Sequence, residues 1–207
     1  MRIERALVGL LFIATAAAGG CGKLAYNLPP ASRLMEPGPG VGGHCIAIDP
    51  SYLSWRVGQR LGFGIGFVEH ATKVNNQMPA YVVGRIAEAL NDLGRAVKGS
   101  AILALGLSYK AGVNDVRESP ALAVMEQLAA KGARCLYHDP FVPTAQIAGE
   151  DLASQPLTPE VLGAMDCVAI LTAHPDVDYR AVVAGSRLVF DARGITRGFD
   201  AANVVRL

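Results

Sequence analysis

Four short, mostly apolar runs dominate the second half of the chain. They read AILALGL (101–107), ARCLYHDP (133–140), CVAILTA (167–173) and RLVFDAR (187–193). The first run is continuously apolar, as expected of a strand buried on both faces of a parallel sheet, and the other three predict further strands. Between the first two lies the helical pattern SPALAVMEQLAAKG, with Ser119 as N-cap, Pro120 at the first helical position and Gly132 just beyond the end. This alternation predicts an α/β, Rossmann-like domain over about residues 99–207, built on a parallel sheet.

The preceding part of the chain, residues 35–98, is predicted to be a loop followed by helices. The proline- and glycine-rich sequence that leads to Cys45 predicts that this residue lies in the loop. Asp49 and Pro50 then form a favourable helix start, an N-cap acceptor followed by proline, so a short helix is expected through 51–60.

A longer helix is predicted over about residues 68–93. Its apolar residues recur at helical spacing, at Val82, Ile86, Ala89, Leu90 and Leu93. Pro79 lies inside this pattern and is expected to kink the helix or to mark a junction between two helices.

The parallel sheet predicts where a ligand would bind. Ligands of such sheets lie at the carboxyl ends of the strands. The sequences that end or follow the four strands, and so share one rim, are SYK, HDP, TAHP and DARG.

Composition narrows the class of protein. The chain has 207 residues, 51% of them hydrophobic and 18% charged, with a formal net charge of +1. This suits one or two domains with a real core and offers no basic patch for nucleic acid. The four cysteines form no CxxC pair and lie near no histidine cluster, so neither a zinc site nor a disulfide framework is expected.

Residues 1–34 stand apart from the rest. Arginines at positions 2 and 5 precede an apolar run over 6–18 and small residues before Cys21, which is the layout of a secretory signal with a lipoprotein-like cleavage site. The run is short for a membrane span. The alternatives are a buried helix, or sequence outside the fold because the start is truncated or shifted.

Glycines 38, 40 and 43 fall at the GxGxxG spacing of a dinucleotide-binding loop. That loop must leave a strand and enter a helix, and no apolar run leads into this one. We therefore expect these glycines to let backbone N–H groups approach a ligand beside the thiol of Cys45.

Several blocks together resemble the UDP-sugar 6-dehydrogenases of the UDP-glucose/GDP-mannose dehydrogenase family, most closely the bacterial UDP-N-acetylglucosamine 6-dehydrogenases. The blocks are GPGVGGHCIAIDPSYLSW, NNQMPAYVVGRI, LGLSYKAGVNDVRESP, HDPFVP, ILTAHPDVDY and VFDARG. The resemblance runs from about Pro37 to the C-terminus. It implies oxidation of a sugar C6 alcohol to a carboxylate, with NAD used twice and a thioester on a cysteine, in surface polysaccharide biosynthesis.

The resemblance also implies roles for individual residues. Cys45 matches the nucleophile, and Asp49 matches the aspartate that assists thioester hydrolysis. The residues matching positions that bind the UDP-sugar are Gly40, Val41, Gly42, Tyr109, Lys110 and Arg193. Arg117 matches an arginine that reaches NAD, and the four histidines are interpreted as structural or loop residues.

The family's N-terminal NAD-binding domain has no counterpart here, so we expect a C-terminal fragment that is inactive alone. A cytoplasmic homodimer paired through the central helix is expected, with no membrane or nucleic-acid partner. Two alternatives stay open. One is a UDP-sugar-binding or dimerising module without catalysis, and the other is a periplasmic protein anchored by a lipid on Cys21.

Overall fold

The computed structural model describes residues 38–207. The chain divides into two compact units, Met1–Met35 and Glu36–Leu207, and only the second is described below. The interpretations of residues 1–34 as a signal and of Cys21 as a lipid anchor therefore lie outside the described residues.

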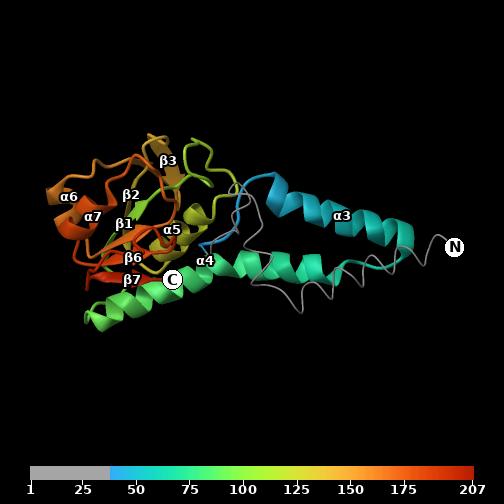
Figure 1. The fold of residues 1–207 in the computed structure, drawn as a ribbon, viewed down its shortest axis with the longest axis horizontal. Helices are drawn as coiled ribbons and strands as arrows, with labels where there is room; N and C mark the ends of the chain where they lie inside the picture. Colours follow the sequence, from blue (N-terminus) through green and yellow to red (C-terminus); the bar gives the residue numbers. More distant parts are fainter. Residues whose placement is uncertain (1–37) are drawn as a thin grey trace. The chain divides into compact units, whose positions relative to one another are not determined.

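A five-stranded parallel sheet forms the centre of the described unit (Figure 1). Its strands are β1 (Ala101–Leu105), β2 (Arg134–His138), β5 (Cys167–Ile170), β6 (Val189–Asp191) and β7 (Val204–Arg206). The first four are the strands that the apolar runs predict, and β7 was not predicted. The spatial order is β2-β1-β5-β6-β7, so the direction in which the sheet grows reverses between β1 and β5. In doubly wound sheets this switch point is where ligands bind.

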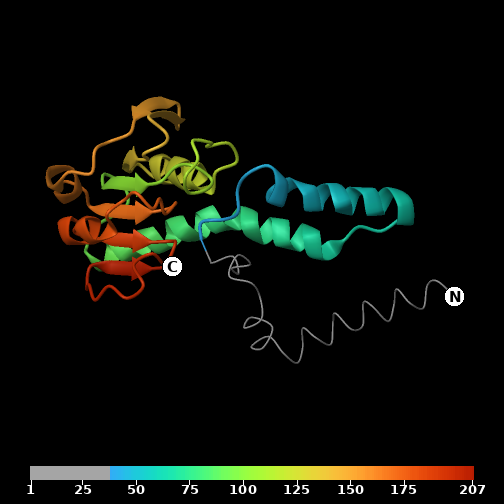
Figure 2. The same ribbon diagram turned by 45° about the horizontal axis from the view of Figure 1, so that its top comes forward.

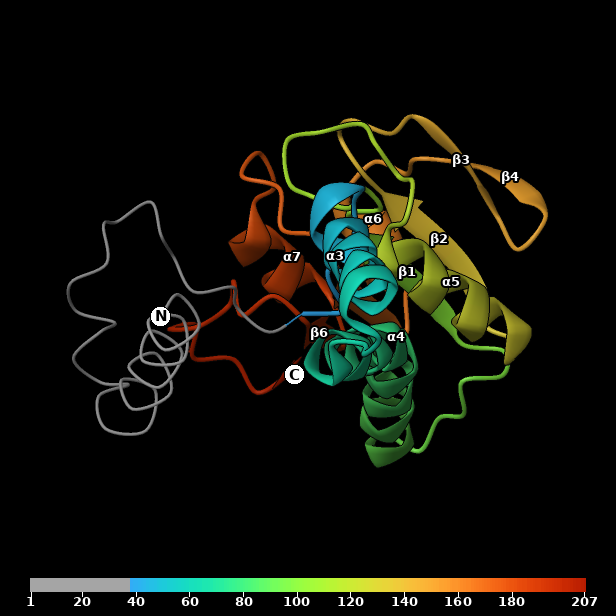
Figure 3. The ribbon, with the colours of Figure 1, turned by 90° about the vertical axis from the view of Figure 1, so that its right-hand side faces the viewer.

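Helices cover both faces of the sheet, which explains why its central strands β1 and β5 are apolar without alternation. Ile102 and Ala104 of β1 pack with α4 (Gly66–Asp92) and α5 (Pro120–Ala130). Leu103 and Leu105 face the opposite way, towards α6 (Pro159–Gly163) and α7 (Tyr179–Gly185) (Figure 3). The predicted α/β, Rossmann-like class is confirmed.

The start of α5 follows the predicted capping pattern. Ser119 adopts an extended conformation and its Oγ accepts a hydrogen bond from the N–H of Ala121, while Pro120 occupies the first helical position. Gly132, just past the end, has a left-handed φ of 85°. An antiparallel hairpin, β3 (Thr144–Ile147) with β4 (Glu150–Ala153), follows β2 and was not predicted.

Two helices precede the sheet as an antiparallel hairpin (Figures 1 and 2). The first, α3, spans Cys45–Leu61, and the second is α4. Ser54 Oγ accepts a hydrogen bond from the N–H of Ile65 at the hairpin's turn. The later half of α4 buries Val82, Ile86 and Leu90 against the sheet. The helix runs unbroken through Pro79, so of the two predicted alternatives, a kink or a junction between helices, the junction is wrong.

The predicted start of α3 is also wrong. The helix begins at Cys45 after an N-cap at His44, so Cys45 does not lie in the loop as predicted, and Asp49 and Pro50 lie inside the helix. Gly43, with a φ of 84°, turns the chain into the helix one turn earlier than the Asp–Pro signal predicts. Pro50, the sixth residue of the helix, has no N–H to donate to the carbonyl of Ile46, so α3 forms with one backbone hydrogen bond fewer at this point.

None of the helices between residues 38 and 207 is long and apolar enough to cross a membrane.

Candidate functional site

Three of the residues that the sequence singles out follow the carboxyl ends of strands in the sheet. Tyr109 and Lys110 follow β1, and Arg193 follows β6. Segment 38–43, which we call the glycine loop, packs against two of these side chains. A Cβ at Gly38 would collide with the guanidinium of Arg193, and one at Gly43 would lie 2.7 Å from Cε2 of Tyr109. The structure therefore brings the glycine loop and the rim together although 66 residues separate Gly43 from Tyr109 and 155 separate Gly38 from Arg193.

Close packing, rather than backbone conformation alone, requires a glycine at position 42. Its φ is not in the left-handed region, yet an added Cβ would overlap the carbonyl oxygen of Glu118 and lie 2.7 Å from Cδ of Pro120. A backbone oxygen cannot move aside as a flexible side chain can. The middle of the glycine loop is thus fitted against the start of α5.

Helix α4 holds the glycine loop from its other side. Asn75 Oδ1 accepts a hydrogen bond from the N–H of Val41 at 2.7 Å, and Asn75 Nδ2 donates to the carbonyl of Val41 at 3.0 Å. The carboxamide therefore satisfies both polar groups of one residue in the loop. The sequence analysis did not single out Asn75, although it lies in the quoted block NNQMPAYVVGRI.

Cys45 and Asp49 are both exposed on α3. Because they are four residues apart on one helix, they lie on the same face within about one turn. Burial raises the pKa of the Cys135 thiol to about 11 and that of the Cys167 thiol to about 12, so these two are poor nucleophiles. Of the three cysteines that the structure describes, Cys45 is therefore the one placed to react.

A buried carboxylate organises the turn after β1. Asp139 Oδ2 accepts hydrogen bonds from the backbone N–H of Leu107 at 2.8 Å and of Ser108 at 3.1 Å, and lies 3.1 Å from Nε2 of His174. Oδ1 accepts from the N–H of Phe141 at 2.8 Å. Burial by itself raises the pKa of Asp139, but these hydrogen bonds outweigh it, so the pKa lies well below its ordinary value. The carboxylate is ionised and fixes the backbone just before Tyr109.

His174 links the same turn to the loop after β5. Its Nδ1 accepts from the N–H of Gly112 at 3.2 Å, so the proton of the neutral ring lies on Nε2 and faces Asp139. Ser108 Oγ lies 3.2 Å from that same Nε2 and donates to the carbonyl of Lys110. In a hydrolase triad the serine and the aspartate contact opposite ring nitrogens. With Ser108 fully buried as well, this cluster is structural support for the rim.

Asp191 fixes the backbone after β6 in the way that Asp139 fixes the turn after β1. Its Oδ1 accepts from the N–H of Arg193 at 2.9 Å, and its Oδ2 accepts from the N–H and the hydroxyl of Thr196 at 2.8 and 2.6 Å. Asp139, His174 and Asp191 lie in the sequences HDP, TAHP and DARG, so the sequence located their positions on the rim but not their supporting role.

Within residues 38–207, Arg117 forms no hydrogen bond or ion pair with the glycine loop. It is exposed and binds Asp115 with two hydrogen bonds, Nε to Oδ1 at 3.0 Å and Nη2 to Oδ2 at 2.8 Å. The bonded guanidinium lowers the pKa of Asp115 to about 2, and the carboxylate raises the pKa of Arg117. Its contact with NAD stays a prediction.

The cofactor that the resemblance implies does not fit the glycine loop. A pyrophosphate would have to lie directly against these glycines. Gly38, Gly42 and Gly43 are instead packed against Arg193, Glu118 and Tyr109. Nor do any three His, Cys, Asp or Glu side chains in residues 38–207 form a group that could hold a metal ion.

Comparison with known proteins matches two family models to consecutive parts of the chain. Residues 24–77 match the central domain of the UDP-glucose/GDP-mannose dehydrogenase family, and residues 103–198 match its UDP binding domain. The prediction of this family from the sequence is confirmed.

Individual relatives agree. A UDP-N-acetyl-D-mannosamine dehydrogenase of Methanococcus maripaludis is 33% identical over 179 residues, which cover 82% of this chain and 38% of the relative. An NDP-N-acetyl-D-galactosaminuronic acid dehydrogenase of Ralstonia solanacearum is 32% identical, with the same coverage. The solved UDP-D-ManNAc dehydrogenase of Pyrococcus horikoshii superposes with a TM-score of 0.69 at 26% identity, covering 89% of this chain and 42% of that one. The chain thus spans about two fifths of its relatives' length, and it belongs to the UDP-glucose/GDP-mannose dehydrogenase family.

Proposed function

We propose that this chain is the nucleophile-bearing and UDP-sugar-binding part of an NAD-dependent UDP-N-acetylhexosamine 6-dehydrogenase. The observation that carries the proposal is the glycine loop, which packs on Tyr109 and Arg193 and leads directly into Cys45. A nucleotide on the rim and a reactive thiol are thereby joined by one short segment.

For the sugar we propose only the class that the relatives have in common, an N-acetylhexosamine. The sequence favours UDP-N-acetyl-D-glucosamine, whereas the relatives are named for N-acetylmannosamine and N-acetylgalactosaminuronic acid. All three are acetamido sugars and differ in configuration at C2 or C4 and in the oxidation of C6. UDP-N-acetyl-D-glucosamine is therefore one of the substrates to be tested.

The chemistry of the thiol follows from its position. The thiolate of Cys45 adds to the carbon of a C6 aldehyde and forms a hemithioacetal. Oxidation of that adduct to a thioester requires a hydride acceptor, for which the described residues offer no fitted site. In the last step water adds to the thioester carbon, the C–S bond breaks and the thiolate is released, while Asp49 takes a proton from the water.

A cytoplasmic location belongs to the same proposal. NAD and UDP-sugars are cytoplasmic metabolites, and a nucleophilic thiol requires reducing surroundings. The sugar acid formed would serve surface polysaccharide synthesis.

Titration calorimetry and an NADH assay test this function together. The isolated chain is expected to bind UDP and UDP-N-acetyl-D-glucosamine, and to form no NADH when given both the sugar nucleotide and NAD. Absence of UDP binding would refute the nucleotide site. Robust turnover by the isolated chain would show that a cofactor site has been overlooked.

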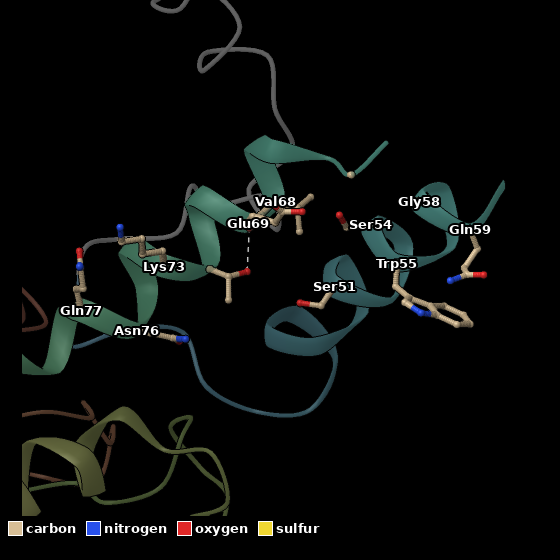
Figure 4. A pocket seen from close by; sticks show the side chains of 12 residues that line it. Ser51, Ser54, Trp55, Gly58, Gln59, Val68, Glu69, Lys73, Asn76 and Gln77 are labelled. Atoms are coloured by element: carbon tan, nitrogen blue, oxygen red, sulfur yellow. Dashed lines mark hydrogen bonds between the residues drawn. The ribbon is translucent and has the colours of Figure 1, made fainter. Parts of the chain in front are cut away.

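The alternative of a non-catalytic dimerising module is favoured by one observation, the exposed apolar surface of the helical hairpin. The large apolar side chains exposed there are Ile46, Ile48, Tyr52, Leu53, Trp55, Leu61, Phe63, Phe67 and Val74. A groove of about 820 Å³ between α3 and α4 lies beside them, lined by residues of both helices such as Trp55 and Lys73 (Figure 4).

A group of large exposed apolar side chains such as this one is typical of a surface that contacts another protein. We propose that it pairs two chains, and we expect sedimentation equilibrium to give twice the mass of 21.7 kDa at micromolar concentration. A monomer under those conditions would contradict the pairing.

A further inference from the structure

The conformation of the glycine loop has to be fixed by contacts with other segments of the chain. Gly40 and Gly43 have φ values of 135° and 84°, which glycine adopts as readily as its other conformations. A loop of this kind loses much conformational entropy when it is held in one arrangement. What holds it therefore decides how well defined the start of α3 and the Cys45 thiol are.

The loop is held from two sides by different forces. On the side of the sheet its contacts are packing contacts, with Arg193, Tyr109 and Pro120. On the side of the helical hairpin, Asn75 is the only side chain in residues 45–92 that hydrogen-bonds to the loop. Its two bonds, at 2.7 and 3.0 Å, enclose Val41, four residues before Cys45.

A carboxamide suits this position in a way that few side chains could. It offers an acceptor to the N–H of Val41 and a donor to the carbonyl of Val41 at once. Aspartate keeps the acceptor but turns a second oxygen towards that carbonyl, and leucine, of similar shape, offers neither group.

We infer that Asn75 is a positioning residue that couples the nucleotide site to the thiol of Cys45, by holding the glycine loop against the rim. The inference rests on the proposed function, because it takes the rim as the place where UDP binds. A nucleotide that contacts Arg193 and Tyr109 lies against the sheet side of the loop. The hydrogen bonds of Asn75 hold the loop in place from the opposite side. UDP then changes the reactivity of Cys45 through the loop.

The test measures alkylation of Cys45 by iodoacetamide in the full chain, read as modification of the peptide that contains Cys45, with and without saturating UDP. UDP is the chosen probe because it lacks the sugar that would cover the thiol directly. The unmodified chain is expected to react more slowly with UDP bound. The loss of two neutral hydrogen bonds together is expected to change the equilibrium constant for holding the loop in this conformation about tenfold.

Asn75→Leu is therefore expected to weaken UDP binding about tenfold and to abolish the effect of UDP on alkylation. Asn75→Asp, which keeps the acceptor for the N–H of Val41, is expected to fall between the two. Asn76→Leu is the matched control, because Asn76 is exposed, lies in the groove between α3 and α4, and has no hydrogen bond to the loop (Figure 4). It should behave as the unmodified chain.

The outcomes separate the inference from the proposed function. If the unmodified chain binds no UDP, the proposed function fails. If it binds UDP but Cys45 reacts at an unchanged rate, or if Asn75→Leu keeps both the affinity and the effect, the coupling is refuted. Should Asn75→Leu not fold, as judged by circular dichroism, Asn75→Asp decides, and behaviour like that of the unmodified chain would overturn the inference.

Discussion

Replacing Arg193 or Lys110 with alanine is expected to weaken UDP binding by about ten- to a hundredfold each, because a hydrogen bond to a charged group is worth about 1.5–3 kcal/mol. The two residues lie at the ends of β6 and β1, separated by β5, on the same edge of the sheet. Two cations there suit a diphosphate, which arginine can bind through two parallel hydrogen bonds. Calorimetric titration of UDP measures both losses.

Arg117→Ala serves as the control. That side chain is exposed and already bound to Asp115, so its removal should leave UDP affinity nearly unchanged. Arg193→Lys keeps the charge but not the two-bond geometry, and is expected to fall between the unmodified chain and Arg193→Ala. Equal losses at Lys110, Arg193 and Arg117 would mean that substrate and cofactor contacts have been divided wrongly. No loss at either Lys110 or Arg193 would show that the rim is not the site.

The sheet could be predicted from the sequence because its signal is local. Strands β1 and β5 are continuous apolar runs, and the burial of both faces by helices is what removes the alternation. The start of α5 is local in the same sense, since Ser119 and Pro120 are adjacent and each fills its own capping position. The position of Tyr109, Lys110 and Arg193 at the rim followed from topology alone.

Contacts between distant segments could not be predicted in that way. Nothing near Asn75 indicates that its carboxamide pairs with Val41, 34 residues earlier. The Asp–Pro pair at 49–50 is a favourable helix start by its local sequence. The turn at Gly43 directs the chain into the helix earlier, so α3 begins four residues before Asp49. Hairpin β3–β4 was missed because its strands have only four residues each, too few for a strand pattern to stand out.

Asp139 shows how a supporting residue can be mistaken for an ordinary turn residue. In the sequence it is the acid of HDP after a strand, which favours a turn. In the structure its side chain is fully buried and its two oxygens receive hydrogen bonds from three backbone N–H groups and His174. Such a group affects the stability of the whole domain and not only the conformation of one turn.

Asp139→Asn is expected to lower the free energy of unfolding by about 3 kcal/mol at pH 7, because a buried, hydrogen-bonded charge is removed and its partners are left without an equivalent acceptor. Asparagine keeps one oxygen, but its NH₂ group cannot accept from Leu107 or Ser108 as Oδ2 does. Urea unfolding followed by circular dichroism measures the change. Asp151→Asn, on exposed β4, is the matched control and should be close to neutral.

Acid should reduce this difference. The pKa of Asp139 is lowered in the folded protein, so its ionised form contributes stability that is fully present above the unfolded value of about 3.9 and is lost as the pH falls towards the folded value. The unmodified chain therefore loses stability below about pH 4. Asp139→Asn has no carboxylate at this position to protonate, so this contribution does not change with pH in the variant. Taking the difference between the two chains cancels the titration of the exposed carboxylates that both share. A difference that stays constant from pH 7 to about pH 3 would mean that the carboxylate's charge is not what stabilises the rim.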